Sequence, residues 1–188
     1  MDANSLTAVR FKAQVSKFSG ILSKGLSKTK QRFFKEVLYG IQASKDVKLS
    51  NISRALLEDI PLIKTENRLS RNLEDEDYSK LLNSEILRLG HRHVTADMVI
   101  AIDPGDICKP YAKAMENLCS VYDGTSKEAV KGYHLCQVTA ANLQHNKIVP
   151  MHCELYSTAE GLVKNNTEKI TEIIDKVSAV IGQIGTWA

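Results

Sequence analysis

The chain contains 188 residues, of which 43% are hydrophobic and 25% are charged. This composition is typical of a globular protein rather than a disordered one. No apolar run approaches the ~20 residues that a membrane-spanning helix needs, and the opening MDANSLTAVRFK lacks the pattern of a signal peptide. These features predict a cytoplasmic protein without a membrane partner. The four cysteines include no CxxC pair, which predicts buried thiols rather than a zinc ribbon or disulfides.

Charge is distributed unevenly along the chain. Residues 1–71 contain 14 Lys and Arg against 6 Asp and Glu, whereas residues 72–188 contain 11 against 16. A basic front half predicts contact with a polyanion. The alternative interpretation is a solvated helical surface rich in lysine.

The first part of the chain has helical periodicity. Residues 5–25 carry apolar side chains at helix-like spacing, and so do residues 31–44, QRFFKEVLYGIQAS. Gly40 lowers the intrinsic stability of the second helix. We therefore expect another helix to approach closely at Gly40.

Two short helices around a turn are expected next. Ser50 is the expected N-cap of a helix that extends to Leu57, and Pro61 ends that pattern. The second helix should extend from about Lys64 to Leu73, with three side chains facing inward: Ile63, Leu69 and Leu73. An acidic run, residues 74–77, is expected to begin a further helix over residues 78–92.

The two short helices are arranged as in a helix-turn-helix, whose second helix lies in the major groove of DNA. Here that helix would present four side chains suited to phosphates and base edges: Lys64, Asn67, Arg68 and Arg71. A two-helix corner of an ordinary helical bundle would give the same pattern.

The remainder of the chain combines strands with helices. MVIAID, residues 98–103, is expected to be a buried strand that ends in the turn Asp103-Pro104-Gly105. A short helix over residues 109–118 and a turn at residues 123–126 should follow. A hairpin of two long strands, 132–143 and 147–157, is expected next. In the helix expected over residues 166–182, one face is apolar: Ile170, Ile173, Ile174, Val177 and Ile181.

A carboxylate at a strand end is a typical metal ligand of phosphoryl-transfer enzymes, because Mg²⁺ prefers oxygen ligands and accepts water for the others. Two such metals can hold the attacking and leaving oxygens of a phosphodiester. Asp103 fits the role of first ligand, and Asp106 is the second choice. The alternative is a turn-forming Asp-Pro-Gly-Asp without a catalytic role.

The run VIAIDPGDICKPYAKAMENLCSVYDGTSKEAVKGYHLCQVTA resembles the opening of the catalytic domain of DDE transposases of bacterial insertion sequences. In that family a strand ends in the first catalytic Asp, and a loop leads to a strand that begins with Gly-Tyr-His, here residues 132–134. The upstream segment LSKTKQRFFKEVLYGIQASKDVKLSNISRALLE resembles the helical DNA-binding region of the same family. The resemblance covers about residues 25–188.

The resemblance implies an α+β protein in which a helical DNA-binding region, residues 1–93, precedes an incomplete ribonuclease-H-like domain, residues 94–188. That domain would contain three antiparallel strands and one helix, and residues 186–188 would begin a fourth strand beside the first. Without the rest of this neighbour, MVIAID would be an apolar edge strand, which favours aggregation.

The resemblance also implies an activity and partners. The intact family uses Mg²⁺ and three acidic residues, of which Asp103 would be the first catalytic residue and metal ligand. The second Asp and the Glu are expected beyond Ala188. A truncated transposase of this kind should be inactive alone and should bind no metal stably. Its expected partners are element-end DNA and either full-length transposase or a second copy of itself.

Two other functions are compatible with the sequence. One is a stand-alone helix-turn-helix DNA-binding regulator without catalysis. The other is a complete small metal-dependent nuclease, which would need Asp106 and Glu154 beside Asp103. Histidine and cysteine could also bind zinc at His134, Cys136, His152 and Cys153, but neighbouring residues of a strand point to opposite faces. We therefore expect no zinc site there.

Overall fold

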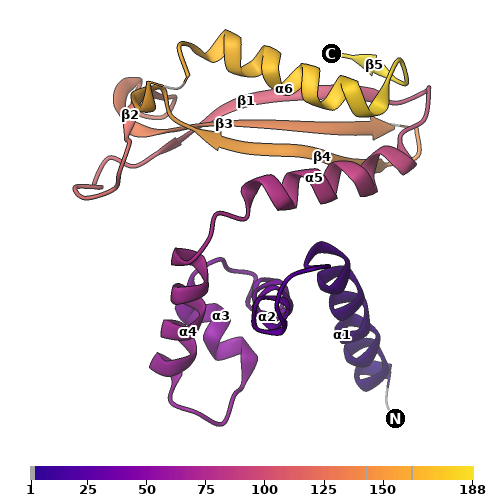
Figure 1. Cartoon of the computed structure of the whole chain (residues 1–188), viewed down its shortest axis with the longest axis vertical. Coiled ribbons are helices and arrows are strands. Elements are labelled where there is room, and N and C mark those ends of the chain that lie inside the picture. Colours follow the sequence, from indigo (N-terminus) through magenta and orange to yellow (C-terminus); the bar gives the residue numbers. More distant parts are fainter. Residues whose placement is uncertain (1–2, 143, 162) are drawn as a thin grey trace. The chain divides into compact units, whose positions relative to one another are not determined.

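The computed structural model describes residues 3–142, 144–161 and 163–188. The chain divides into two compact units, Met1–Tyr78 and Ser79–Ala188 (Figure 1). The first unit is helical, and the second contains the sheet, so the protein is α+β. The boundary falls before the one that the sequence suggested, because the helix beginning at Ser79 packs on the sheet. None of the described helices combines the length and the apolar composition that a membrane crossing requires.

The helical unit contains four helices: α1 (Ala3–Leu22), α2 (Lys28–Ser44), α3 (Leu49–Leu56) and α4 (Leu62–Glu74). The hydroxyl of Ser27 accepts a hydrogen bond from the backbone N–H of Lys30 and so caps α2. Phe33 and Phe34 of α2 both lie against the ring of Tyr78. The buried side chains include those of Phe33, Phe34, Ile52 and Leu69, which hold α2, α3 and α4 together.

The expectation for Gly40 is confirmed. A Cβ atom at position 40 would lie 2.5 Å from Cγ2 of Ile52 and 3.2 Å from its Cα. Ile52 is 1% exposed and belongs to α3. The missing side chain at position 40 therefore permits the close packing of α3 on α2.

Three details of the α3–α4 pair differ from the sequence expectation. The N-cap of α3 is Lys48 rather than Ser50, and it makes no side-chain capping bond. The helix α4 begins at Leu62, one turn after α3 ends in a left-handed residue, Leu57. Leu69 is buried as expected, but two other side chains predicted to face inward are exposed: Ile63 and Leu73.

The second unit begins with α5 (Ser79–Gly90) and a short 3₁₀ helix (His91–His93). Its strands are β1 (Val99–Cys108), β2 (Cys119–Asp123), β3 (Glu128–Asn142), β4 (Lys147–Tyr156) and β5 (Thr186–Trp187). A second 3₁₀ helix (Thr158–Glu160) and α6 (Asn166–Ile181) separate β4 from β5. The predicted hairpin is confirmed as β3 and β4, although Leu143 lies outside the described residues. The helix predicted over residues 166–182 is confirmed as α6.

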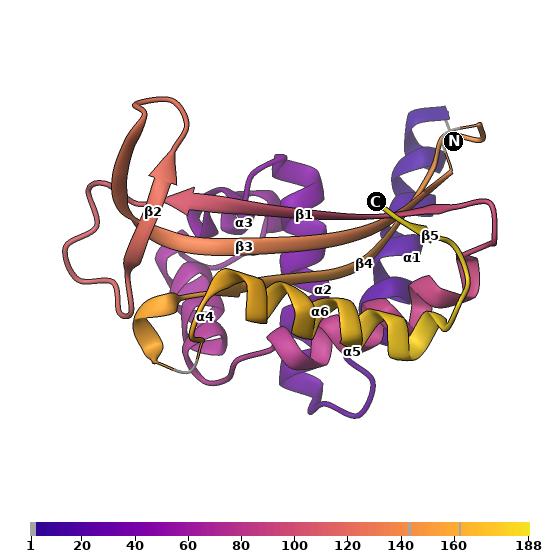
Figure 2. The ribbon, with the colours of Figure 1, turned by 90° about the horizontal axis from the view of Figure 1, so that it is seen from above.

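The strand order of the sheet is β4-β3-β1-β5, with β2 paired to the first part of β3. β1 pairs antiparallel with β3 and parallel with β5. The expectation that residues 186–188 begin a strand beside MVIAID is therefore confirmed, and β5 covers the edge of β1 at Val99 and Ile100. Figure 2 shows the long strands side by side, with α6 running along them.

The prediction that the first strand ends at Asp103 is wrong. β1 continues through Asp103, Pro104 and Gly105 to Cys108, in unbroken register with β3. The N–H of Ile102 bonds to the carbonyl of Ala188 on the β5 side. The ring nitrogen of Pro104, two residues later, points to the same edge and so interrupts no bond to β3.

The segment between β1 and β2 is also different from the prediction. Residues 109–118 form turns and bends rather than the expected helix. The strand β2 that follows was not predicted. Its partners are residues 128–132, so that β3 begins before the expected Gly132.

The core of the second unit lies between the sheet and its helices. Ile173, Val177 and Ile181 of α6 pack against buried side chains of β1 and β3, among them Ile100 and Val138. The helix α5 lies along β4. The amide side chain of Asn83 in α5 bonds both the N–H and the carbonyl of Cys153, and thereby covers part of the open edge of β4.

Candidate nucleic-acid interface and candidate metal ligand

Three of the four predicted DNA-binding residues share the exposed side of α4. Lys64, Asn67 and Arg71 are exposed, and their spacing of three or four residues places them on one face of the helix. Ile63 lies beside them and is 60% exposed. The opposite side of α4 is buried through Thr65 and Leu69. The helix thus presents one polar, partly cationic face while its other face anchors it in the unit.

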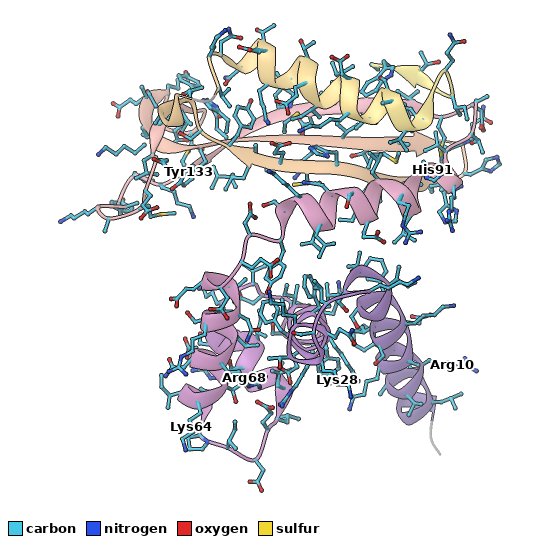
Figure 3. All side chains as sticks on the ribbon, viewed as in Figure 1. Arg10, Lys28, Lys64, Arg68, His91 and Tyr133 are labelled. Carbon is cyan, nitrogen blue, oxygen red and sulfur yellow. The ribbon has the colours of Figure 1, made fainter. Side chains whose placement is uncertain are left out.

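Arg68 does not belong to this exposed face. Its guanidinium pairs with Glu36 of α2 and, at 2.5 Å, with Glu58 of the α3–α4 connection. Figure 3 labels Arg68 and Lys64 on α4. Arg32 pairs with the same two carboxylates at 2.5 and 2.6 Å. The two arginines and two glutamates form a closed ring of charges. Arg68 therefore has a structural role in positioning α4, and the sequence prediction that it contacts DNA directly is not supported by its placement.

The charge ring also includes a hydroxyl. Thr65 donates a hydrogen bond of 2.7 Å to Glu58. Burial opposes ionisation of this carboxyl, but the hydrogen bonds from Thr65 and Arg68 outweigh burial and lower the pKa of Glu58. Glu58 is thus ionised at neutral pH, and the ring ties α2, the α3–α4 connection and α4 to one another.

The helical unit is less basic than the first 71 residues alone. Residues 1–78 contain 14 Lys and Arg against 10 Asp and Glu, because the acidic run at residues 74–77 belongs to this unit. These acids lie at and beyond the C-terminal end of α4. The cationic character of α4 is therefore concentrated in its first three turns.

Asp103 is exposed and is paired opposite Gln137 of β3. Its neighbour Ile102 packs against the core beneath α6, so Asp103 points to the other face of the sheet. β5 accompanies β1 only as far as Ile102, whose N–H makes the last bond between the two segments. The carboxylate of Asp103 thus lies on β1 one residue beyond the last backbone bond to residues 186–188.

The other carboxylates suggested for a metal site do not converge with Asp103. Asp106 lies opposite His134 on the face that carries α6, and its Oδ1 is 2.7 Å from Nδ1 of His134. Glu154 is on that face as well, opposite the buried Cys136. Among the described residues, no group of three His, Cys, Asp or Glu side chains could hold a metal ion. Asp103 alone does not meet the ligand requirement of Mg²⁺, and the nuclease interpretation loses its second and third carboxylates.

The four residues considered as zinc ligands differ in burial. His134, Cys136 and His152 are buried, whereas Cys153 is exposed. All four cysteines are free thiols. Of these, Cys119 and Cys136 are buried, so the expectation of buried thiols holds for two of the four.

Glu154 is the centre of a second charge cluster that the sequence did not indicate. Nε2 of His152 lies 2.9 Å from one of its carboxylate oxygens, and Nζ of Lys169 lies 2.5 Å from the other. The hydrogen bond from His152, together with Lys169 and Lys176, lowers the pKa of Glu154 to about 2. Glu154 and His152 also line a cavity of about 570 Å³ between α5, β4 and α6. Since Lys169 and Lys176 belong to α6 whereas Glu154 and His152 belong to β4, the cluster fastens this helix to the strand.

Compared with known proteins, the chain matches no family model and no curated protein.

Two features of α4 were not predicted from the sequence. The exposure of Ile63 could not be recognised, because helical spacing alone placed it inside. The pairing of Arg68 had a partial signal in the spacing of Arg32 and Glu36, which allows an ion pair within α2.

Proposed function

We propose that this protein is a DNA-binding protein of the DDE transposase type. In this proposal the helical unit binds duplex DNA through α4. The sheet unit is ribonuclease-H-like, and Asp103 is the first carboxylate of a site for metal-dependent DNA strand transfer. The other carboxylates of such a site have no counterpart among the described side chains around Asp103, so DNA binding is the activity that the proposal assigns to these residues.

The observation that carries the proposal is the strand order of the sheet. The resemblance to DDE transposases predicted a set of three antiparallel strands, a crossover helix and a fourth strand on the far side of the first. The spatial order β4-β3-β1-β5 supports that arrangement, and so does the position of α6 between β4 and β5 along the chain. The exposed carboxylate of Asp103 on the central strand β1 supports it further.

The α4 face supports DNA binding. A second helix that follows a short helix and a turn, and that exposes Lys64, Asn67 and Arg71, is suited to the major groove. Lysine and arginine attract the phosphates, and an amide side chain can bond to base edges. The charge ring around Arg68 holds α4 by its other side, so that the exposed face is presented on a fixed support.

A titration of a fluorescently labelled duplex with the whole chain tests the proposal. We expect the affinity to fall steeply between ~50 and ~200 mM salt, because phosphate contacts release counterions. Replacement of Lys64 or Arg71 by Ala should each reduce the slope of log K against log salt by about 1. The control is Lys113→Ala, which removes an exposed lysine from the sheet unit. Affinity that is absent, or that does not depend on salt or on α4, would contradict the proposal.

A stand-alone DNA-binding regulator remains the second candidate, because the α4 face supports DNA binding without any metal. The two candidates differ at Asp103. A transposase-type site predicts that a divalent cation binds weakly at this carboxylate when DNA phosphates supply further oxygen ligands, whereas a regulator predicts no preference for it.

A further inference from the structure

The exposed face of α4 contains two side chains that electrostatic attraction to DNA does not explain. Asn67 is exposed and uncharged, and Ile63 is apolar but 60% exposed. They are one helical turn apart and therefore neighbours on the surface. Lys64 and Arg71 lie on the same face. Within the part of the chain that the structure describes, the side chains of Lys64, Asn67 and Arg71 have no hydrogen-bond or ion-pair partner.

We propose that α4 reads an A·T base pair in the major groove, with Asn67 bonding to adenine and Ile63 contacting a thymine methyl group. This inference rests on the proposed DNA binding and names the sequence feature that α4 recognises. Lys64 and Arg71 provide attraction to the phosphates without regard to sequence.

The chemistry of the two side chains matches that base pair. In the major groove adenine presents N7 as an acceptor and the N6 amino group as a donor, and an asparagine amide can bond to both. Thymine presents a C5 methyl group, which takes an apolar contact. Ile63 contributes little to the core of the unit because it is largely exposed. A methyl group in the groove gives this side chain an apolar neighbour.

The charges near α4 fix which end faces the DNA. Ile63, Lys64 and Asn67 lie in the first two turns of the helix, and the acidic run at residues 74–77 lies at its other end. Phosphates repel that acidic end, so the N-terminal turns enter the groove. Recognition helices contact base edges with their N-terminal residues in the same way.

The same region could instead meet a protein. Leu57, Ile60 and Ile63 around the α3–α4 connection are 88%, 46% and 60% exposed. DNA is favoured because Lys64, Asn67 and Arg71 occupy the centre of the α4 face, where an interface between proteins would be expected to be depleted in Lys. A protein partner is therefore treated as an outcome of the test.

Selection from a library of duplexes with a randomised central segment tests the inference. The wild-type chain should enrich a motif that contains an invariant A·T pair. Asn67→Ala should lower the preference for that pair by about tenfold or more, and Ile63→Ala should weaken the preference for its thymine. Lys64→Ala is the matched control, since it should weaken binding to all sequences alike and leave the motif unchanged. Both Asn67 and Ile63 are exposed, so thermal melting should show that the variants remain folded.

Three results would overturn the inference. Salt-dependent binding without an enriched motif, or with a motif that Asn67→Ala leaves intact, would reject base recognition while the proposed DNA binding stands. Sedimentation that shows self-association lost in Ile63→Ala would assign the face to a second copy of the chain instead. No binding to any duplex would remove the proposed function itself, and the inference with it.

Discussion

The close contact between α2 and α3 permits a sharp test of the helical unit. Gly40→Ala would place a Cβ atom 2.5 Å from Cγ2 of Ile52 and 3.2 Å from its Cα. Overpacking of this kind costs about 1–3 kcal/mol, whereas Ala in place of Gly within a helix contributes about 0.5–1 kcal/mol. We expect a net loss of about 1–2 kcal/mol in the free energy of unfolding of the helical unit.

Thermal unfolding followed by far-ultraviolet circular dichroism measures this loss. For a unit of this size the midpoint should fall by roughly 4–8 °C for each kcal/mol. The fluorescence of Trp187, the single tryptophan of the chain, reports on the sheet unit and should change little. Since the chain has two units, the two signals are fitted as separate transitions.

Gly20→Ala is the matched control for this substitution. Gly20 also lies within a helix, but a Cβ atom there would meet nothing within 4 Å apart from its chain neighbours and the backbone of its own helix. This variant should be more stable than the wild type by about 0.5–1 kcal/mol. In an Ile52→Ala background, Gly40→Ala should lose most of its effect because Cγ2 is gone. If Gly40→Ala stabilises the unit as much as Gly20→Ala, the packing of α3 on α2 described above is incorrect.

Three further predictions concern the charged residues. Because the pKa of Glu154 is lowered to about 2 from 4.5 in the folded state, its carboxylate should stabilise the sheet unit fully above about pH 5. This contribution, up to about 3 kcal/mol, is then lost as the pH falls toward 2. Urea unfolding followed by Trp187 fluorescence should show the free energy of unfolding declining across this pH range. Glu154→Gln should make this pH dependence weaker, whereas the control Glu168→Gln, at an exposed position, should leave it unchanged. Arg68→Ala removes one of the two arginines that pair with Glu36 and Glu58 and should lower the free energy of unfolding by about 1–3 kcal/mol. Arg71→Ala should change it by less than about 0.5 kcal/mol and weaken only DNA binding, so equal effects of both variants on stability would contradict the assigned roles. With DNA present, Mn²⁺ should selectively broaden the amide resonances of Asp103 and Gln137, and this broadening should disappear in Asp103→Asn. Uniform broadening would contradict the assignment of Asp103 as a metal ligand.

The elements that could be predicted from the sequence are those in which local pattern and tertiary packing agree. The hairpin of β3 and β4 and the apolar face of α6 follow from periodicity, and both are present. Gly40 was informative because a glycine lowers the stability of a helix, and close packing of a second helix gives a reason for its presence. The resemblance to DDE transposases predicted a strand beginning near Thr186 beside the first strand, and β5 pairs with β1 there.

The features that could not be predicted depend on partners far away in the sequence. Asp103-Pro104-Gly105 is locally a turn signal, yet the ladder with β3 keeps it extended, and the nitrogen of Pro104 points away from β3. The ion pairs of Arg68 with Glu36 and Glu58 join residues that are 32 and 10 positions apart. Spacing along α4 alone could not show that Arg68 faces inward while Lys64 and Arg71 face outward.

The central claim is that duplex DNA meets this protein on the exposed face of α4. Amide chemical shifts of the isotopically labelled chain, recorded as an unlabelled duplex is added, test it residue by residue. We expect the largest changes on residues 62–72, and higher salt should reverse them. Changes that spare α4, or that spread evenly over both units, would contradict it.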